Sequence, residues 1–237
     1  MRKNRTWPIT AVLLLLLGFS AAWLWPETKG VEGGKRYDRL VIRGATVIDG
    51  KGIPPRGPLD VIIEGTAIQS VRGTSPKDDV YEKEAHVLDA RGMYLLPGLI
   101  NLHAHLQDSR AGMPMPFEYS YKIWLGCGIT TIRDVGSNFA KTAEERRKSQ
   151  EGLIAAPRIF IYTPVGGRTP EEARLSVQEA KKKGADGIKI FGTDRDILAA
   201  ILAEARTQGL RSAIHIGVEE IDAWDAAEGG VTSIEHW

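Results

Sequence analysis

The sequence predicts an α/β protein whose larger part is a parallel (β/α) barrel. After residue 97, short apolar runs alternate with stretches of helical periodicity, which is the pattern of consecutive βα units on a parallel sheet. Before residue 97, β-branched runs bounded by glycines predict a small sheet domain. We therefore expect a (β/α)8 TIM-like barrel of which about six βα units are present, preceded by part of a small β-sandwich domain.

Residues 37–96 are expected to form the N-terminal part of the small β-domain. The runs "RLVIRGATVIDG" and "LDVIIEGTAIQSVRG" are rich in β-branched residues, and Glu64-Gly65 interrupts the second run as a tight hairpin would. The stretch "HVLDARGMYLLPG" adds a further extended piece. His86 lies in this region and is interpreted as a structural residue.

Residues 97–237 are expected to form the incomplete barrel. Its strands are predicted at "LINLHAHL", "TTIRDVG", "RIFIYT", "GIKIF", "SAIHIG" and "SIEHW". Helices are predicted between them over residues 117–125, 143–153, 171–183, 196–208 and 219–228. The fourth helix carries one apolar stripe, and Asp194 and Gly209 fall at its expected N-cap and C-terminal stop.

Residues 1–26 predict export, because three basic residues in the first five precede an apolar core at 9–19. Small residues at 20–22 suit cleavage of a signal peptide. The apolar stretch over residues 8–25 also approaches the roughly 20 residues that span a bilayer, with tryptophans at both ends. A cleaved signal and a retained membrane anchor both stay open, and both place the protein in the periplasm or outside the cell. Residues 27–36 are expected to be a linker.

Charge and cysteine content exclude two classes of protein. The chain has 31 Lys and Arg against 30 Asp and Glu, a formal net charge of +1, so no nucleic-acid partner is expected. The single cysteine, Cys127, excludes an intramolecular disulfide. We interpret Cys127 as a small core residue, because no base lies beside it to activate a nucleophile.

Four of the five histidines lie at the ends of predicted strands. His103 and His105 are two residues apart, so strand alternation points both imidazoles to one face, where they could chelate one metal ion. His215 ends the fifth predicted strand and His236 the sixth. The carboxyl ends of the strands are where barrels bind ligands, so the pattern predicts a metal site there.

Lys189 lies between Ile188 and Ile190 in the fourth predicted strand. An unpaired ammonium in such a segment would be costly, which leaves two explanations open. One is a partner carboxylate. The other is reaction with carbon dioxide to give a carbamate, an anionic oxygen ligand able to bridge two cations.

The chain resembles the amidohydrolase superfamily, in the branch that includes imidazolonepropionase-like proteins and Xaa-Pro or Xaa-Arg dipeptidases. The resemblance covers the chain from about Tyr37 to its last residue. It rests on six stretches in the family's order: "LLPGLINLHAHL", "GCGITTIRDVGS", "AAPRIFIYT", "GADGIKIF", "SAIHIG" and "GGVTSIEHW".

The resemblance implies a centre of two divalent metal ions, usually zinc. His103 and His105 would hold one ion, His215 and His236 the other, and Lys189, as a carbamate, would bridge them. Such a centre activates a water for attack on an amide-type bond. The expected partner is therefore a small-molecule or dipeptide-like substrate with a peptide, N-acyl or cyclic amide bond. A decarboxylase, deaminase or isomerase on the same scaffold stays open.

One catalytic group of the family has no counterpart here. In the family, an aspartate at the end of the eighth strand serves as general base, and the present sequence stops at Trp237. The pattern assigns that role neither to Asp134 nor to Glu235, so no catalytic residue is predicted. We expect the chain to be a fragment of a longer protein or a truncated product. The alternative function is a non-catalytic fragment, tethered to the membrane if residues 8–25 are retained.

Three further residues are weaker candidates. Arg133 and Asp134 are expected just after the second strand, and Tyr162 just after the third. They would lie close enough to the pocket to touch a substrate, but a salt-bridged or core role is equally open. The stretch "MPMPFEYSYKIW" could shape a substrate lid or contribute ordinary packing.

Overall fold

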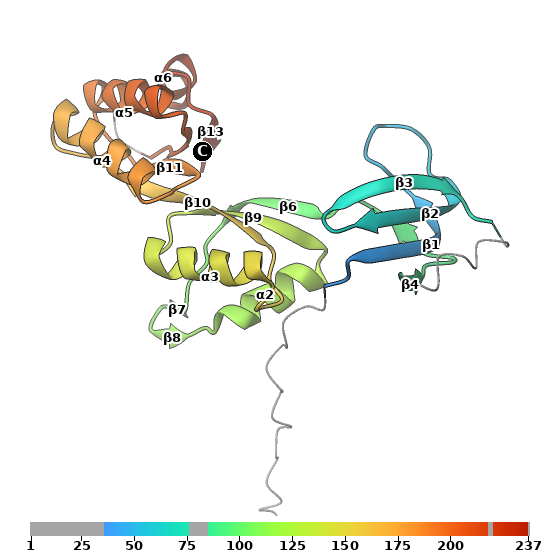
Figure 1. The fold of residues 1–237 in the computed structure, drawn as a ribbon. Helices are drawn as coiled ribbons and strands as arrows, with labels where there is room; N and C mark the ends of the chain where they lie inside the picture. The colour runs from blue at the N-terminus through green and yellow to red at the C-terminus, as the bar shows by residue number, and fades with distance from the viewer. Residues whose placement is uncertain (1–35, 76–84, 218–219, 237) are drawn as a thin grey trace, which may run out of the picture. The chain divides into compact units, whose positions relative to one another are not determined.

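The structure, a computed structural model, describes residues 36–75, 85–217 and 220–236. The segment expected to be a signal peptide or membrane anchor lies outside these residues. Among the residues described, no helix combines the length and the apolar character needed to cross a bilayer. The described elements form a small mixed sheet and a larger parallel sheet with its helices (Figure 1).

The small sheet has five strands in the order β3-β2-β1-β4, with β5 also paired to β1. β1 is antiparallel to β2 and parallel to β4 and β5. The expected hairpin at Glu64-Gly65 joins β2 to β3, and Gly65 has a φ of +56°, which glycine adopts without strain. His86 is exposed in β4 and stacks on Tyr37, with ring centroids 3.9 Å apart. The bounds are β1 (Arg39–Val47), β2 (Arg56–Glu64), β3 (Ala67–Gly73), β4 (His86–Asp89) and β5 (Tyr94–Leu95).

The larger sheet has six strands in the order β13-β12-β11-β10-β9-β6, and every neighbouring pair is parallel. Each of its strands lies within one of the six predicted apolar runs or overlaps it, which confirms a partial TIM-like barrel. The strands are β6 (Leu99–Ala104), β9 (Ile129–Val135), β10 (Arg158–Val165), β11 (Gly187–Ile190), β12 (Arg211–His215) and β13 (Ser233–Glu235). A hairpin of β7 (Ser109–Arg110) and β8 (Met113–Pro114) follows β6.

The helices between these strands are α2 (Phe117–Gly126), α3 (Phe139–Glu151), α4 (Pro170–Lys182), α5 (Arg195–Gln208) and α6 (Ala223–Glu228). α3 begins four residues earlier than predicted, because the side chain of Asn138 caps it by accepting from the Lys141 amide. α6 begins four residues later than predicted, because a capping box between Asp222 and Asp225 sets its start. Cys127, expected in the core, is instead exposed at the C-terminal end of α2.

The two faces of the parallel sheet differ in composition. Ile188 and Ile190 in β11 are fully buried in an apolar cluster that includes residues of α4 and α5. Lys189, between them, lies on the opposite face because side chains alternate along a strand. The paired register continues that face through Pro164 of β10 and Ala213 of β12. We call the first face the helix face and the second the site face.

Candidate metal centre

All five residues predicted to hold metal lie in or directly after strands of the parallel sheet. His103 is in β6 and His105 follows its end; Lys189 is the third residue of β11. His215 is the last residue of β12, and His236 directly follows β13 with a φ of +58°. A positive φ is uncommon outside glycine, and histidine is one of the residues that adopt it more often than most.

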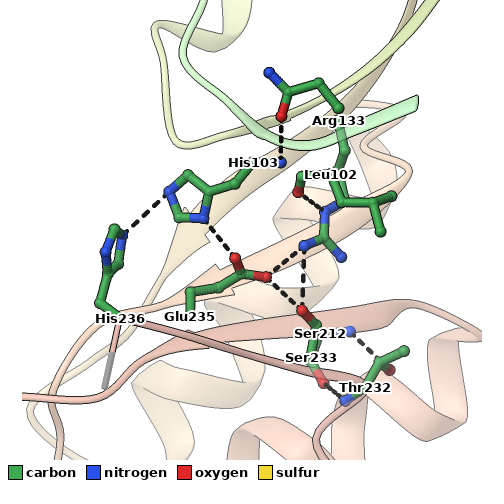
Figure 2. Close-up of polar contacts among 9 residues, drawn as sticks. Leu102, His103, Arg133, Ser212, Thr232, Ser233, Glu235 and His236 are labelled. Carbon is green, nitrogen blue, oxygen red and sulfur yellow. Dashed lines mark hydrogen bonds and ion pairs between the residues drawn. The ribbon is translucent and has the colours of Figure 1, made fainter. Parts of the chain in front are cut away.

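The structure brings the four imidazoles into one cluster. The ring centroids of His103 and His105 are 5.2 Å apart, and those of His103 and His236 are 4.5 Å apart. His215 extends the cluster, with its ring centroid 4.5 Å from that of His236. Nε2 of His103 and Nε2 of His236 are 3.1 Å apart (Figure 2). Histidines from three strand ends therefore face a common space.

Lys189 is buried beside this cluster. The residue is 1% exposed, and its Nζ is one of the buried polar atoms that make no hydrogen bond among the described residues. Its Nζ lies 5.8 Å from the centroid of the Phe191 ring, and the centroid of the same ring is 5.9 Å from that of His215. Burial lowers the pKa of Lys189, although Glu235 partly opposes this effect. The first explanation for this lysine was a partner carboxylate, and no carboxylate among the described residues pairs with its Nζ.

Glu235 connects the cluster to the rest of the site face. Its Oε2 lies 2.5 Å from Nδ1 of His103, and its Oε1 accepts from Arg133 and from Ser233 (Figure 2). Burial would raise the pKa of Glu235, but the hydrogen bonds from Ser233 and His103 and the charge of Arg133 outweigh it, so the pKa lies below its usual value. Glu235 is therefore held as a carboxylate.

Arg133 and Tyr162 lie inside their strands rather than after them, which corrects the expected positions. The Arg133 guanidinium pairs with Glu235, donates to the Leu102 carbonyl at 2.5 Å and lies 5.0 Å from the centroid of the Tyr162 ring. Of the two roles left open for Arg133, the structure thus supports the salt-bridged one. Tyr162 is 6% exposed and covers Gly187, where an added Cβ would lie 2.5 Å from its ring.

Asp134 also lies inside β9, and its side chain is occupied by backbone amides. It is completely buried; Oδ2 accepts from the Leu106 amide at 2.6 Å and Oδ1 from the Ser137 amide at 2.9 Å. These bonds tie together the loops that follow β6 and β9, so Asp134 has a structural role. Burial lowers the pKa of nearby His105, the charge of Asp134 opposes that shift, and the charge of His103 adds to it.

The residue types at the cluster suit a divalent ion, because imidazole nitrogens are common ligands of such ions. In the part of the chain that the structure describes, no three His, Cys, Asp or Glu side chains are arranged to hold one ion. One observation nevertheless agrees with a pair of bridged ions: the buried amine of Lys189 makes no hydrogen bond among the described residues.

Two of the cavities that described residues line lie beside the strands of the parallel sheet. One of about 450 Å³ lies on the site face and includes Leu102, Arg133 and Tyr162 in its lining. The other, of about 250 Å³, lies where β6 and β9 end and is lined in part by Asp108 and Lys141, which form an ion pair. Phe117, from the stretch considered as a lid, also lines the second cavity.

Sequence relatives of the chain are enzymes of several names. A dihydroorotase from Streptomyces coelicolor is 40% identical over 159 residues, which cover 66% of this chain and 35% of that protein. An adenine deaminase 2 from Agrobacterium fabrum is 36% identical over 101 residues, which cover 43% of this chain and 15% of that protein. The chain thus spans about a third or less of the length of these relatives.

Similarity to a solved structure covers more of this chain than either of these two sequence relatives does. A crystal structure of a Xaa-Pro dipeptidase with bound methionine in its active site matches with a TM-score of 0.69 and 23% identity, covering 84% of this chain and 61% of that one. At this identity the match establishes the fold. The profile of the amidohydrolase family matches residues 94–237, which is more than half of the sequence and contains the whole histidine cluster. The chain belongs to the amidohydrolase family.

Proposed function

We propose that this chain carries the metal-binding part of a hydrolase that attacks amide-type bonds with a water activated by a binuclear metal centre. The observation that carries the proposal is that four histidines gather at the strand ends beside the buried amine of Lys189, which makes no hydrogen bond to a described residue. Family membership supports a hydrolase of carbon-nitrogen bonds.

Five residues would hold the ions. His103 and His105 would bind one ion and His215 and His236 the other, while the carbamate of Lys189 would bridge them. When bound, two such ions lower the pKa of a shared water and polarise the substrate carbonyl. Zinc is the metal we expect, because imidazole nitrogens are ligands that suit it.

Lys189 is suited to become the carbamate. Burial lowers its pKa, which favours the neutral amine whose lone pair can attack carbon dioxide. The lone pair of Nζ forms a bond to the carbon while one C–O π bond of carbon dioxide breaks and leaves the negative charge on oxygen. One proton passes from the nitrogen to water, and an anionic carboxylate results. The absence of a hydrogen-bond partner at Nζ among the described residues means that no existing bond must break for this reaction.

The proposed substrates are small molecules or dipeptides with a peptide, N-acyl or cyclic amide bond. The similarity to a dihydroorotase and to the structure of a Xaa-Pro dipeptidase supports this class. A deaminase is the second candidate, supported by the 36% identity to an adenine deaminase 2. A substrate panel with dipeptides, N-acyl amino acids, cyclic amides and aminopurines separates the two, because only the deaminase releases ammonia from an aminopurine.

Residues 1–26 are proposed to export the protein and, if retained, to anchor it through residues 8–25. Fractionation of expressing cells, followed by sequencing of the mature N-terminus, tests this proposal. Recovery of the full N-terminus from the cytosol would contradict it.

Metal content tests the binuclear centre. The purified chain, loaded with zinc in the presence of bicarbonate and then desalted, is expected to retain two ions per chain by mass spectrometry of metals. Lys189→Met should retain at most one ion, whereas His86→Ala, which changes a histidine in β4, should retain two. A 13C NMR signal from labelled bicarbonate that disappears in Lys189→Met would identify the carbamate. Wild-type content near zero, or an unchanged content in Lys189→Met, would refute the bridged centre.

A further inference from the structure

Glu235 holds one side of the His103 ring through a contact between the two edge strands of the parallel sheet. Its Oε2 lies 2.5 Å from Nδ1 of His103, and the residues are 132 positions apart in the sequence. Glu235 is 8% exposed, so little water competes for its oxygens. A carboxylate has no proton to give, and Oε1 of Glu235 already accepts from Arg133 and Ser233, an arrangement that suits the charged form. The proton of this hydrogen bond therefore belongs to Nδ1.

Two further donors determine which oxygen of Glu235 faces His103. The guanidinium of Arg133 and the hydroxyl of Ser233 both contact Oε1 (Figure 2). Arg133 is itself fixed by the Leu102 carbonyl at 2.5 Å and by the Ser233 hydroxyl at 3.1 Å. Because Oε1 already accepts two hydrogen bonds, Oε2 is the oxygen that accepts from the imidazole.

The proton on Nδ1 decides what the other ring nitrogen of His103 can do. A neutral imidazole carries hydrogen on one nitrogen and a lone pair on the other, so Nε2 of His103 presents its lone pair. It lies 3.1 Å from Nε2 of His236, and one of these two atoms must donate. In the metal-free chain that donor is His236, which consequently carries its hydrogen on Nε2.

We propose that Glu235 is a positioning residue that fixes His103 in the tautomer with hydrogen on Nδ1 and a lone pair on Nε2. Arg133 and Ser233 act through it by fixing its carboxylate. The inference rests on the proposed function in one respect, because it takes His103 as a metal ligand. A carboxylate on the second nitrogen of a ligating histidine orients the ring and strengthens the ligand.

The substitution Glu235→Gln should reverse the tautomer rather than merely weaken the contact. Arg133 and Ser233 can only be satisfied by the amide oxygen, because both donate to this position. The amide NH2 of the glutamine then faces Nδ1 of His103 and requires it to accept. The hydrogen moves to Nε2 of His103, which donates to His236, and His236 must shift its own hydrogen to Nδ1.

Nitrogen-15 NMR of the metal-free, chelator-treated chain reads these tautomers directly. We would record imidazole signals at about pH 8.5, well above the unperturbed histidine pKa of about 6.5, and assign His103 and His236 by the loss of one signal in His103→Gln and in His236→Gln. Glu145→Gln is the matched control, since Glu145 is also a buried carboxylate, bonded to Tyr121 and Lys148 of α2 and α3.

Wild type and Glu145→Gln are expected to show hydrogen on Nδ1 of His103 and on Nε2 of His236, and Glu235→Gln the reverse at both rings. Hydrogen on Nε2 of His103 in the wild type would overturn the proposal, and this measurement decides the matter even if Glu235→Gln does not fold. Unchanged tautomers in a folded Glu235→Gln would also overturn it.

Zinc affinity supplies the second measurement. Glu235→Gln is expected to weaken binding by roughly 10- to 100-fold in competition with a chromophoric chelator, and Glu145→Gln by less than about twofold. Equal affinity of Glu235→Gln and wild type would overturn the positioning role. If the wild type binds no zinc while its tautomers are as expected, the proposed function fails and the fixed tautomer of His103 still stands, so the two failures are distinguishable.

Discussion

The two faces of the parallel sheet use the same strands for opposite purposes. On the helix face, Ile188 and Ile190 are fully buried in an apolar cluster. On the site face, the same strand presents Lys189, whose amine makes no hydrogen bond to a described residue, while β9 presents Arg133 and β13 presents Glu235. Period-2 alternation separates the groups. The comparison indicates that one face stabilises the sheet while the other accepts unfavourable burial of polar groups.

The largest effect is expected from removing one charge of the buried pair on the site face. Arg133→Met leaves Glu235 buried without its guanidinium partner, which should lower the free energy of unfolding by about 3–5 kcal/mol. Urea denaturation followed by circular dichroism measures it. Arg147→Met is the matched control, because the ion pairs of Arg147 with Glu144 and Glu151 are exposed and such pairs contribute about 0–1 kcal/mol. Similar losses in both variants would remove the distinction between buried and exposed charges.

A similar or slightly smaller decrease in the free energy of unfolding is expected for a substitution on the helix face. Ile188→Ala empties a fully buried position in the cluster against α4 and α5, at a cost of about 2–5 kcal/mol. The comparison variant is Ile100→Ala on β6, whose side chain is 60% exposed and should change stability by less than about 1 kcal/mol. A cost at Ile100 as large as that at Ile188 would contradict the assignment of the stabilising core to the helix face.

The sequence was informative wherever local periodicity determines the outcome. The alternation of apolar runs and helical patterns predicted all six parallel strands and all five helices, with errors at the ends of α3 and α6, where capping side chains set the boundary. The apolar run around Lys189 also predicted that an unpaired ammonium there would be costly, and the residue is 1% exposed. These features depend on neighbours a few residues away, which a single sequence displays directly.

The sequence was uninformative where contacts join distant strands. Glu235 had no assigned role, because its partner His103 is 132 residues away and meets it only when the sheet curves. Arg133 and Asp134 are adjacent, yet alternation sends them to different faces, one to an ion pair and the other to backbone amides. Strand alternation would have predicted this difference if both residues had been placed inside the strand. They were expected after its end, where alternation no longer applies.

The smallest expected effect has the opposite sign and separates the faces most sharply. Lys189→Met replaces a buried amine, which makes no hydrogen bond to any described residue, by an apolar side chain of similar length. In the metal-free, bicarbonate-free protein this should raise the free energy of unfolding by about 1 kcal/mol, because the burial cost of an unsatisfied polar group disappears. Lys182→Met, at a site whose side chain is 79% exposed, should change it by less than about 0.5 kcal/mol. A substantial loss of stability in Lys189→Met would show that the amine has a structural partner in the folded chain, and the case for a lysine kept free to become a metal bridge would fail with it.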